Sequence, residues 1–167
     1  MAYVYWITGL AGAGKTSIGT LLYEKIKQKY CNTVFLDGDV LREVFGNDLG
    51  YTREERIRCA MRYAKLCKML QEQGMNVICC TISMFDEIRG WNRENVGCYR
   101  EIYVRVSMEE LTRRNQKHLY SSSADNREVA GIQINIEEPK CPDMILENEG
   151  DVSVSVLVDR VIERFEI

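Results

Sequence analysis

The sequence has little of several features that mark other classes of protein. It contains only two prolines and one histidine in 167 residues, while 46% of the residues are hydrophobic and 28% are charged. This composition excludes a low-complexity or disordered chain. No apolar run approaches the roughly 20 residues that a membrane-spanning helix needs, and the first residues lead into a strand pattern without a charged leader. We therefore expect one cytoplasmic domain over residues 1–167.

Charge and cysteine usage narrow the classes further. The net charge is −3, so the surface as a whole does not favour nucleic acids or membranes as partners. The seven cysteines are an odd number without C-x-x-C spacing, and there is one histidine. A zinc site or a disulfide framework is therefore not expected. Cys79 and Cys80 lie in an apolar run and are predicted to be small core residues.

What the sequence does contain is a glycine-rich loop, GLAGAGKT, over Gly9–Thr16. It follows an apolar run from Tyr3 to Thr8 and precedes a helical pattern over residues 17–29, which is the strand-loop-helix setting of the G-x-x-x-x-G-K-[ST] motif. Glycines let successive backbone N–H groups turn toward a polyphosphate, and the helix N-terminus adds its positive dipole end. The flanking strand and helix disfavour a chance match. We therefore predict a nucleoside triphosphate site.

Particular atoms of this loop have expected roles. Lys15 is expected to reach the outer phosphates of the nucleoside triphosphate, and the Thr16 hydroxyl is expected to ligate Mg²⁺. The predicted cofactor-binding residues of the loop are Gly9, Leu10, Ala11, Gly12, Ala13, Gly14, Lys15, Thr16 and Ser17.

The remaining pattern alternates strands with helices. The expected strands are residues 3–8, 33–36, 76–82, 101–106 and 143–147. The expected helices are residues 17–29, 40–45, 53–73, 85–97, 107–116 and 151–165. This order predicts an α/β P-loop NTPase fold, with a five-stranded parallel sheet covered by helices on both faces. The pattern dissolves between Lys117 and Pro142, so a lid is expected over about residues 113–142.

Parallel strands end at one edge of a sheet, where ligands gather. The phosphate loop, residues 37–39 and residues 81–83 should therefore face one cleft. Asp39 is the candidate base for an acceptor hydroxyl because it follows the second strand, and Gly38 would permit a close approach. The alternative is that Asp39 only caps the helix expected from Val40.

Basic residues form a second group of candidates. Arg42, Arg53, Arg56, Arg58 and Arg62 lie on or beside two neighbouring helices, where arginine suits bidentate contacts with anions. The alternative is that they pair with acidic neighbours at the surface.

The expected lid also begins with basic residues, Arg113, Arg114 and Lys117. Such charges can close on a transferring phosphoryl group. For Arg113 the alternative is a favourable interaction with the helix dipole. His118 is expected to be an exposed loop residue.

Several stretches together resemble the adenylylsulfate kinase family, in order and at that family's spacings. They are WITGLAGAGKTS, FLDGDVLREVFGNDLGYTREER, TIS, EIYVRV, RRNQKHLY and EEPKCPDMIL, between about Tyr5 and Leu146. The resemblance implies a homodimeric P-loop kinase that transfers the γ-phosphoryl of MgATP to the ribose 3′-hydroxyl of adenylyl sulfate, a small nucleotide acceptor.

The resemblance also implies roles for residues at matching positions. The catalytic set is Asp39, Lys15 and Lys117, and Arg114 joins the ATP-binding set. The implied acceptor-binding residues are Asp37, Asp39, Arg42, Tyr51, Arg56, Cys59, Ile82, Ser83, Lys117 and Val129. Arg42 and Arg56 match arginines that hold the acceptor's phosphate end, and Tyr51 stands where a phenylalanine stacks on the base.

The departures from the family pattern gather on the acceptor side. Cys59 replaces an asparagine, Val129 replaces a second stacking aromatic residue, and Met84 replaces the proline after the sometimes phosphorylated Ser83. The resemblance thus keeps the reaction while leaving the acceptor open. Adenylyl sulfate is the first expectation. Cytidine diphosphoramidate, used by a related branch, is the alternative because a smaller base would suit Val129.

Two readings from other classes stay open. A regulatory ATP-binding module without catalysis is disfavoured because Lys15, Asp39 and Lys117 are retained. An unrelated P-loop kinase would explain Gly9–Thr16 but not the motifs that follow.

Overall fold

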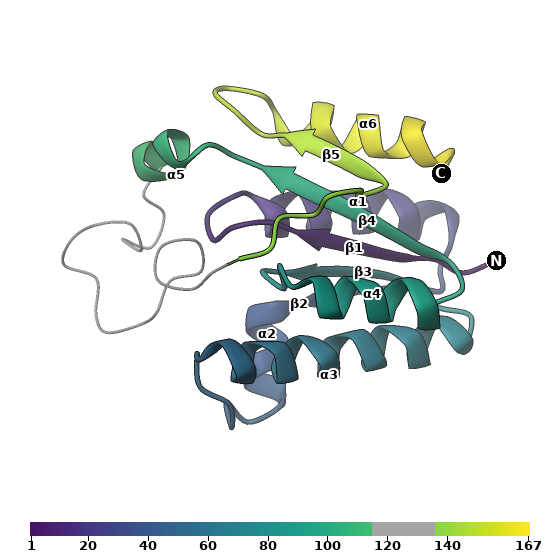
Figure 1. Cartoon of the computed structure of the whole chain (residues 1–167). Helices are drawn as coiled ribbons and strands as arrows, with labels where there is room; N and C mark the ends of the chain where they lie inside the picture. Colours follow the sequence, from purple (N-terminus) through teal and green to yellow (C-terminus); the bar gives the residue numbers. More distant parts are fainter. Residues whose placement is uncertain (115–135) are drawn as a thin grey trace.

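The computed structural model describes residues 1–114 and 136–167, which form a parallel sheet between two layers of helices (Figure 1). The strand order is β2-β3-β1-β4-β5, and every neighbouring pair is parallel. The strands are β1 (Val4–Thr8), β2 (Thr33–Asp37), β3 (Asn76–Thr81), β4 (Tyr99–Arg105) and β5 (Met144–Glu147). The helices are α1 (Lys15–Lys29), α2 (Gly38–Val44), α3 (Arg53–Glu72), α4 (Asp86–Asn95), α5 (Met108–Arg114) and α6 (Val154–Phe165). The predicted fold class is confirmed.

The central strand β1 is buried on both faces, and its side chains project alternately into two hydrophobic cores, one on each side of the sheet. Tyr5 and Ile7 belong to the core under α1 and α6, whereas Val4 and Trp6 belong to the core under α3 and α4. Figure 1 shows these helix pairs on opposite sides of the sheet. The continuous apolar runs therefore mark strands covered on both sides, as the sequence predicted.

The boundaries of several elements differ from the predicted ones. The first helix begins at Lys15 instead of Ser17, so Lys15 and Thr16 lie on its first turn. The fourth strand begins at Tyr99 instead of Glu101. The last helix begins at Val154 instead of Asp151, because the Ser153 side chain accepts a hydrogen bond from the backbone and acts as its N-cap.

The start of α2 decides one alternative about Asp39. The N-cap is Asp37, whose side chain accepts a hydrogen bond from the backbone N–H of Asp39. Asp39 lies within the first turn of the helix, so the hypothesis that Asp39 caps it is wrong. A carboxylate at either position is favourable because the helix N-terminus carries partial positive charge.

The two adjacent cysteines are core residues, as predicted. Cys79 is 0% exposed and Cys80 is 2% exposed, and burial raises the pKa of the Cys80 thiol. Within the two described ranges, no helix is long and apolar enough to cross a bilayer.

Candidate active site

The phosphate loop has the backbone shape that its glycines predict. Gly9, Gly12 and Gly14 have φ values of 154°, 77° and 91°, which side chains disfavour. A Cβ at Gly9 would lie 2.5 Å from the carbonyl oxygen of Val104 in β4. Glycine is therefore required at this position by both backbone conformation and close approach, and the loop is shaped to receive phosphates.

Lys15 is the first residue of α1, directly after the loop glycines, and is 8% exposed. Its Nζ donates a 2.7 Å hydrogen bond to the carbonyl oxygen of Leu10, across the loop. Below it, Cys80 Sγ donates to the Lys15 carbonyl oxygen at 3.2 Å, which connects α1 to β3. The ammonium group is thus held over the loop, where an anion would meet it.

Thr16 and Asp37 bring the phosphate loop and the end of β2 together. Thr16 Oγ1 donates a 2.7 Å hydrogen bond to Asp37 Oδ2, while Asp37 Oδ1 accepts from the Asp39 N–H at 2.9 Å. A hydroxyl and a carboxylate are hard oxygen donors of the kind that Mg²⁺ prefers. In the described residues no group of three or more His, Cys, Asp and Glu could hold a metal ion. This donor set fits Mg²⁺, which keeps waters and substrate phosphates as its other ligands.

Three predicted acceptor residues come together around the loop between α2 and α3: Arg42 of α2, Tyr51 of the loop and Arg56 of α3. The guanidinium carbons of Arg42 and Arg56 lie 4.4 Å and 5.2 Å from the centre of the Tyr51 ring, which is 39% exposed. Arg42 also donates to the carbonyl oxygens of Leu49 and Gly50 at 2.5 Å and 3.1 Å, and Arg56 Nε donates to that of Tyr51 at 2.8 Å. Cation–π contacts and these hydrogen bonds therefore set the shape of this loop.

Cys59, another predicted acceptor residue, is 5% exposed and belongs to the core under α3. Its Sγ donates to the Tyr63 hydroxyl at 2.9 Å, and that hydroxyl donates to the Gly38 carbonyl oxygen at 3.0 Å. Burial is the main cause that raises the pKa of Tyr63, and the hydrogen bond with Cys59 raises this pKa further. The pair therefore connects α3 to the beginning of α2, beside Asp39.

β3 ends at Thr81, one residue earlier than predicted, so Ile82 lies in the loop after the strand together with Ser83. Ile82 is half-buried. Ser83 is 6% exposed, and its Oγ lies 2.7 Å from Thr81 Oγ1. The Ser83 hydroxyl is thus enclosed in this structure, and Met84 beside it is fully buried.

On the other side of the loop, Arg114 ends α5 and is connected to the phosphate loop through Asn148. Arg114 donates from Nε to Glu110 at 2.6 Å and from a terminal nitrogen to the Asn148 carbonyl oxygen at 2.8 Å. Asn148 is 6% exposed and donates from Nδ2 to the Ala13 carbonyl oxygen at 2.9 Å. Sequence reasoning missed Asn148, although a polar residue directly after β5 could have pointed to it.

Glu110 lies between two arginines of its own helix. Arg113 donates to it twice at 2.7 Å, and Arg114 donates at 2.6 Å. These hydrogen bonds lower the pKa of Glu110 to about 2, and those from Arg113 have the largest effect. The other predicted residues of this region, Lys117, His118 and Val129, lie outside the described residues.

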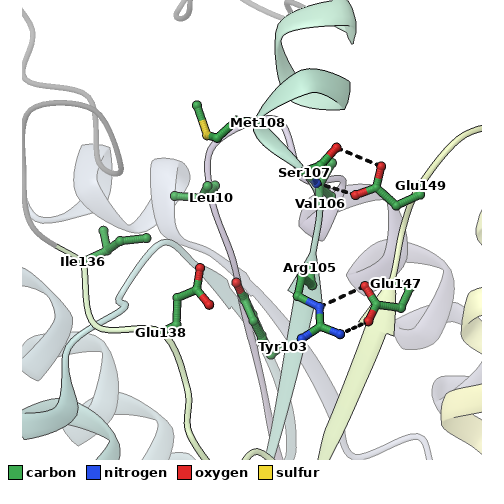
Figure 2. A pocket seen from close by; sticks show the side chains of 10 residues that line it. All are labelled: Leu10, Tyr103, Arg105, Val106, Ser107, Met108, Ile136, Glu138, Glu147 and Glu149. Atoms are coloured by element: carbon green, nitrogen blue, oxygen red, sulfur yellow. Dashed lines mark hydrogen bonds and ion pairs between the residues drawn. The ribbon is translucent and has the colours of Figure 1, made fainter.

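A cavity of about 410 Å³ lies beside the start of the phosphate loop, at the ends of β4 and β5 (Figure 2). Leu10 is the one predicted site residue in its lining. Glu147 binds Arg105 Nε at 3.0 Å, and Glu149 accepts from Ser107 Oγ at 3.1 Å, as Figure 2 shows. The lining also contains three glutamates, Glu138, Glu147 and Glu149, of which Glu147 is paired with Arg105.

Comparison with known proteins identifies the family of this chain. The family model for adenylylsulphate kinase matches residues 1–147. The cytidine diphosphoramidate kinase of Campylobacter jejuni is 42% identical over 99% of this chain and 97% of its own length. A probable adenylyl-sulfate kinase of Aeropyrum pernix is 36% identical over 89% of this chain and 84% of its own.

Solved structures agree with the sequence relatives. The Mycobacterium tuberculosis APS kinase CysC in complex with AMPPNP and APS has a TM-score of 0.90 and 28% identity, covering 99% of this chain and 98% of that one. The chain therefore belongs to the adenylylsulphate kinase family and is a phosphotransferase with the P-loop kinase fold.

Proposed function

We propose that this kinase transfers the γ-phosphoryl group of MgATP to a ribose 3′-hydroxyl of cytidine diphosphoramidate. The relative named for that nucleotide is 42% identical over 99% of the chain, compared with 36% over 89% for the adenylyl-sulfate kinase of A. pernix. By the family resemblance, Cys59 and Val129 replace acceptor-binding residues, whereas the whole phosphate loop is kept. Acceptor choice is therefore the part of the function that has changed.

On the ATP side, the loop amides and Lys15 bind the phosphates, with Lys15 exchanging its bond to the Leu10 carbonyl for one to phosphate oxygen. Thr16 and Asp37 would hold Mg²⁺. Bound Mg²⁺ neutralises the developing charge on the phosphoryl oxygens. Arg114 is proposed to reach ATP at the other side of the loop, and Lys117 to act on the phosphoryl group.

On the acceptor side, Asp39 is proposed to accept the proton of the ribose hydroxyl and aim it at the phosphorus. The observation that carries this proposal is the 2.7 Å contact between Thr16 and Asp37, because it connects the phosphate loop with the helix turn that contains Asp39. Arg42 and Arg56 would bind the acceptor's phosphate end while Tyr51 stacks on its base. Two such chains are proposed to form a homodimer.

Adenylyl sulfate is the second candidate. The family model and the likeness to a kinase solved with AMPPNP and APS both favour it. Losing a second aromatic face at Val129 would weaken stacking on adenine by about 1 to 3 kcal/mol. That change would reduce the use of adenylyl sulfate without altering the reaction type.

A coupled ADP-release assay with MgATP distinguishes these candidates. We expect a higher kcat/KM with cytidine diphosphoramidate than with adenylyl sulfate. A clear preference for adenylyl sulfate would assign the acceptor to the second candidate. ATP binding without turnover on either nucleotide would favour the regulatory ATP-binding module.

A further inference from the structure

Glu137 connects three segments that are far apart in the sequence. Its Oε1 accepts a 2.8 Å hydrogen bond from Arg53, the first residue of α3. Its Oε2 accepts from the backbone N–H of Asp86, the first residue of α4, at 2.5 Å. Its own N–H donates to the Met84 carbonyl oxygen at 2.9 Å. One residue thus holds α3, α4 and the loop after β3 together.

The bond to Asp86 fills a specific deficit in α4. The N-cap position of this helix is Phe85, which makes no side-chain cap hydrogen bond. Such a helix start leaves backbone N–H groups without partners and carries partial positive charge. The carboxylate of Glu137 supplies both an acceptor and a negative charge there, so α4 is capped from a distant segment.

The bond to Arg53 makes the arrangement a brace between helices. The Arg53 guanidinium carbon lies 5.5 Å from the centre of the Phe85 ring, and Phe85 is 4% exposed. Arg53 therefore contacts the Phe85 ring at the start of α4 and forms an ion pair with Glu137. Both contacts fix how far the first turn of α3 lies from the first turn of α4.

Both turns adjoin residues that the family resemblance assigns to the acceptor. The first wall of the site consists of Tyr51 and Arg56, at the beginning of α3. The second wall consists of Ile82 and Ser83, directly before the Met84 carbonyl that Glu137 holds. We propose that Glu137 is a positioning residue that sets the spacing of these two walls and thereby the discrimination between large and small acceptor bases. This inference rests on the proposed function.

Three variants test the brace with both nucleotides as acceptors, the acceptor KM being measured at saturating MgATP and the ATP KM at saturating acceptor. Glu137→Ala removes the cap and the ion pair, and Glu137→Gln keeps an acceptor oxygen for the Asp86 N–H. Arg53→Gln removes the ion pair together with the contact to the Phe85 ring and leaves the cap in place. We expect Glu137→Ala to raise the acceptor KM about tenfold and to reduce the preference between the two nucleotides, while kcat and the ATP KM change less than about twofold. Glu137→Gln should recover part of the loss.

Lys25→Gln is the matched control, because Lys25 forms a 2.6 Å ion pair with Asp159 between α1 and α6, away from the proposed walls. It should leave the acceptor KM and the base preference unchanged. Equal increases in the acceptor KM and the ATP KM in Glu137→Ala would overturn the proposal, as would an unchanged acceptor KM.

A readout without substrates separates this inference from the proposed function. Amide hydrogen exchange at Asp86 should be about tenfold faster in Glu137→Ala than in the unaltered protein, since the N–H loses its acceptor. Unchanged exchange at Asp86 would show that Glu137 does not hold α4 and would overturn the brace. If neither nucleotide were phosphorylated by the unaltered protein, the proposed function would fail, while this exchange result would still decide the contact.

Discussion

Thr16 in the first turn of α1 donates a 2.7 Å hydrogen bond to Asp37 at the end of β2. The two residues are adjacent in space because β1 and β2 are both parallel partners of β3 and end at the same edge of the sheet. Asp37 also caps α2, so one carboxylate meets the phosphate loop and orients the helix turn that contains Asp39. Asp37 therefore connects the ATP-binding part of the proposed site with the acceptor-binding part.

Asp37→Asn should impair the use of Mg²⁺ more than it disturbs the fold. The amide oxygen can still accept the Thr16 hydrogen bond or cap α2, but the negative charge is lost. We expect the Mg²⁺ concentration for half-maximal turnover to rise by about 10- to 100-fold. Mg²⁺ titrations of turnover measure this, with Asp48→Asn as a control on an exposed carboxylate that pairs with Arg62. The same Mg²⁺ requirement in both variants would remove Asp37 from the metal site.

Asp39→Asn tests the proposed base. An amide cannot accept the hydroxyl proton, so turnover should fall by about 10²- to 10⁴-fold. ATP affinity, measured by equilibrium binding of a nonhydrolysable analogue, should change little because the phosphate loop is untouched. Turnover close to that of the unaltered enzyme would exclude Asp39 from the base role.

Asn148→Ala should affect the ATP side. It leaves the Ala13 carbonyl oxygen without its buried partner, which costs about 1 to 3 kcal/mol of unfolding free energy. Because that carbonyl belongs to the phosphate loop, the ATP KM should rise by about tenfold while the acceptor KM stays near its original value. Denaturant unfolding and steady-state kinetics measure the two effects.

Asn95→Ala is the control for this variant, since Asn95 makes a 2.9 Å bond of the same type to the Trp91 carbonyl but at an exposed position. It should change stability only slightly. An Asn148→Ala enzyme with normal ATP KM would show that the buried bond serves the fold alone.

The pKa of Glu110 gives a prediction about acid sensitivity. The hydrogen bonds from Arg113 are the largest cause, and together with the bond from Arg114 they lower this pKa to about 2, below the ordinary value of 4.5. A lowered pKa in the folded state means that the stabilisation is fully present above the unfolded value and is lost as the pH falls toward 2. Glu110→Gln should therefore lower the thermal midpoint at about pH 6, and the difference from the unaltered protein should shrink by about pH 3. A difference that is independent of pH would contradict this account.

Much of the fold was predictable because its signals are local. The phosphate loop is contiguous, and β1 and β3 are apolar runs whose length and content identify strands covered on both faces. Arg42, Tyr51 and Arg56 were also named in advance, and they do meet in the structure. Their catalytic and binding roles stay predictions, as do those of Lys117 and Val129.

The tertiary structure alone decided which side chains meet across long stretches of sequence. The contact from Thr16 to Asp37 spans 21 residues, that from Arg53 to Glu137 spans 84, and that from Asn148 to Ala13 spans 135. The sequence determined which segments are strands and which side chains lie near their ends, because propensity and periodicity act within a few residues. It did not determine these three pairings, because a hydrogen bond between distant residues depends on the packing of the helices that position both partners.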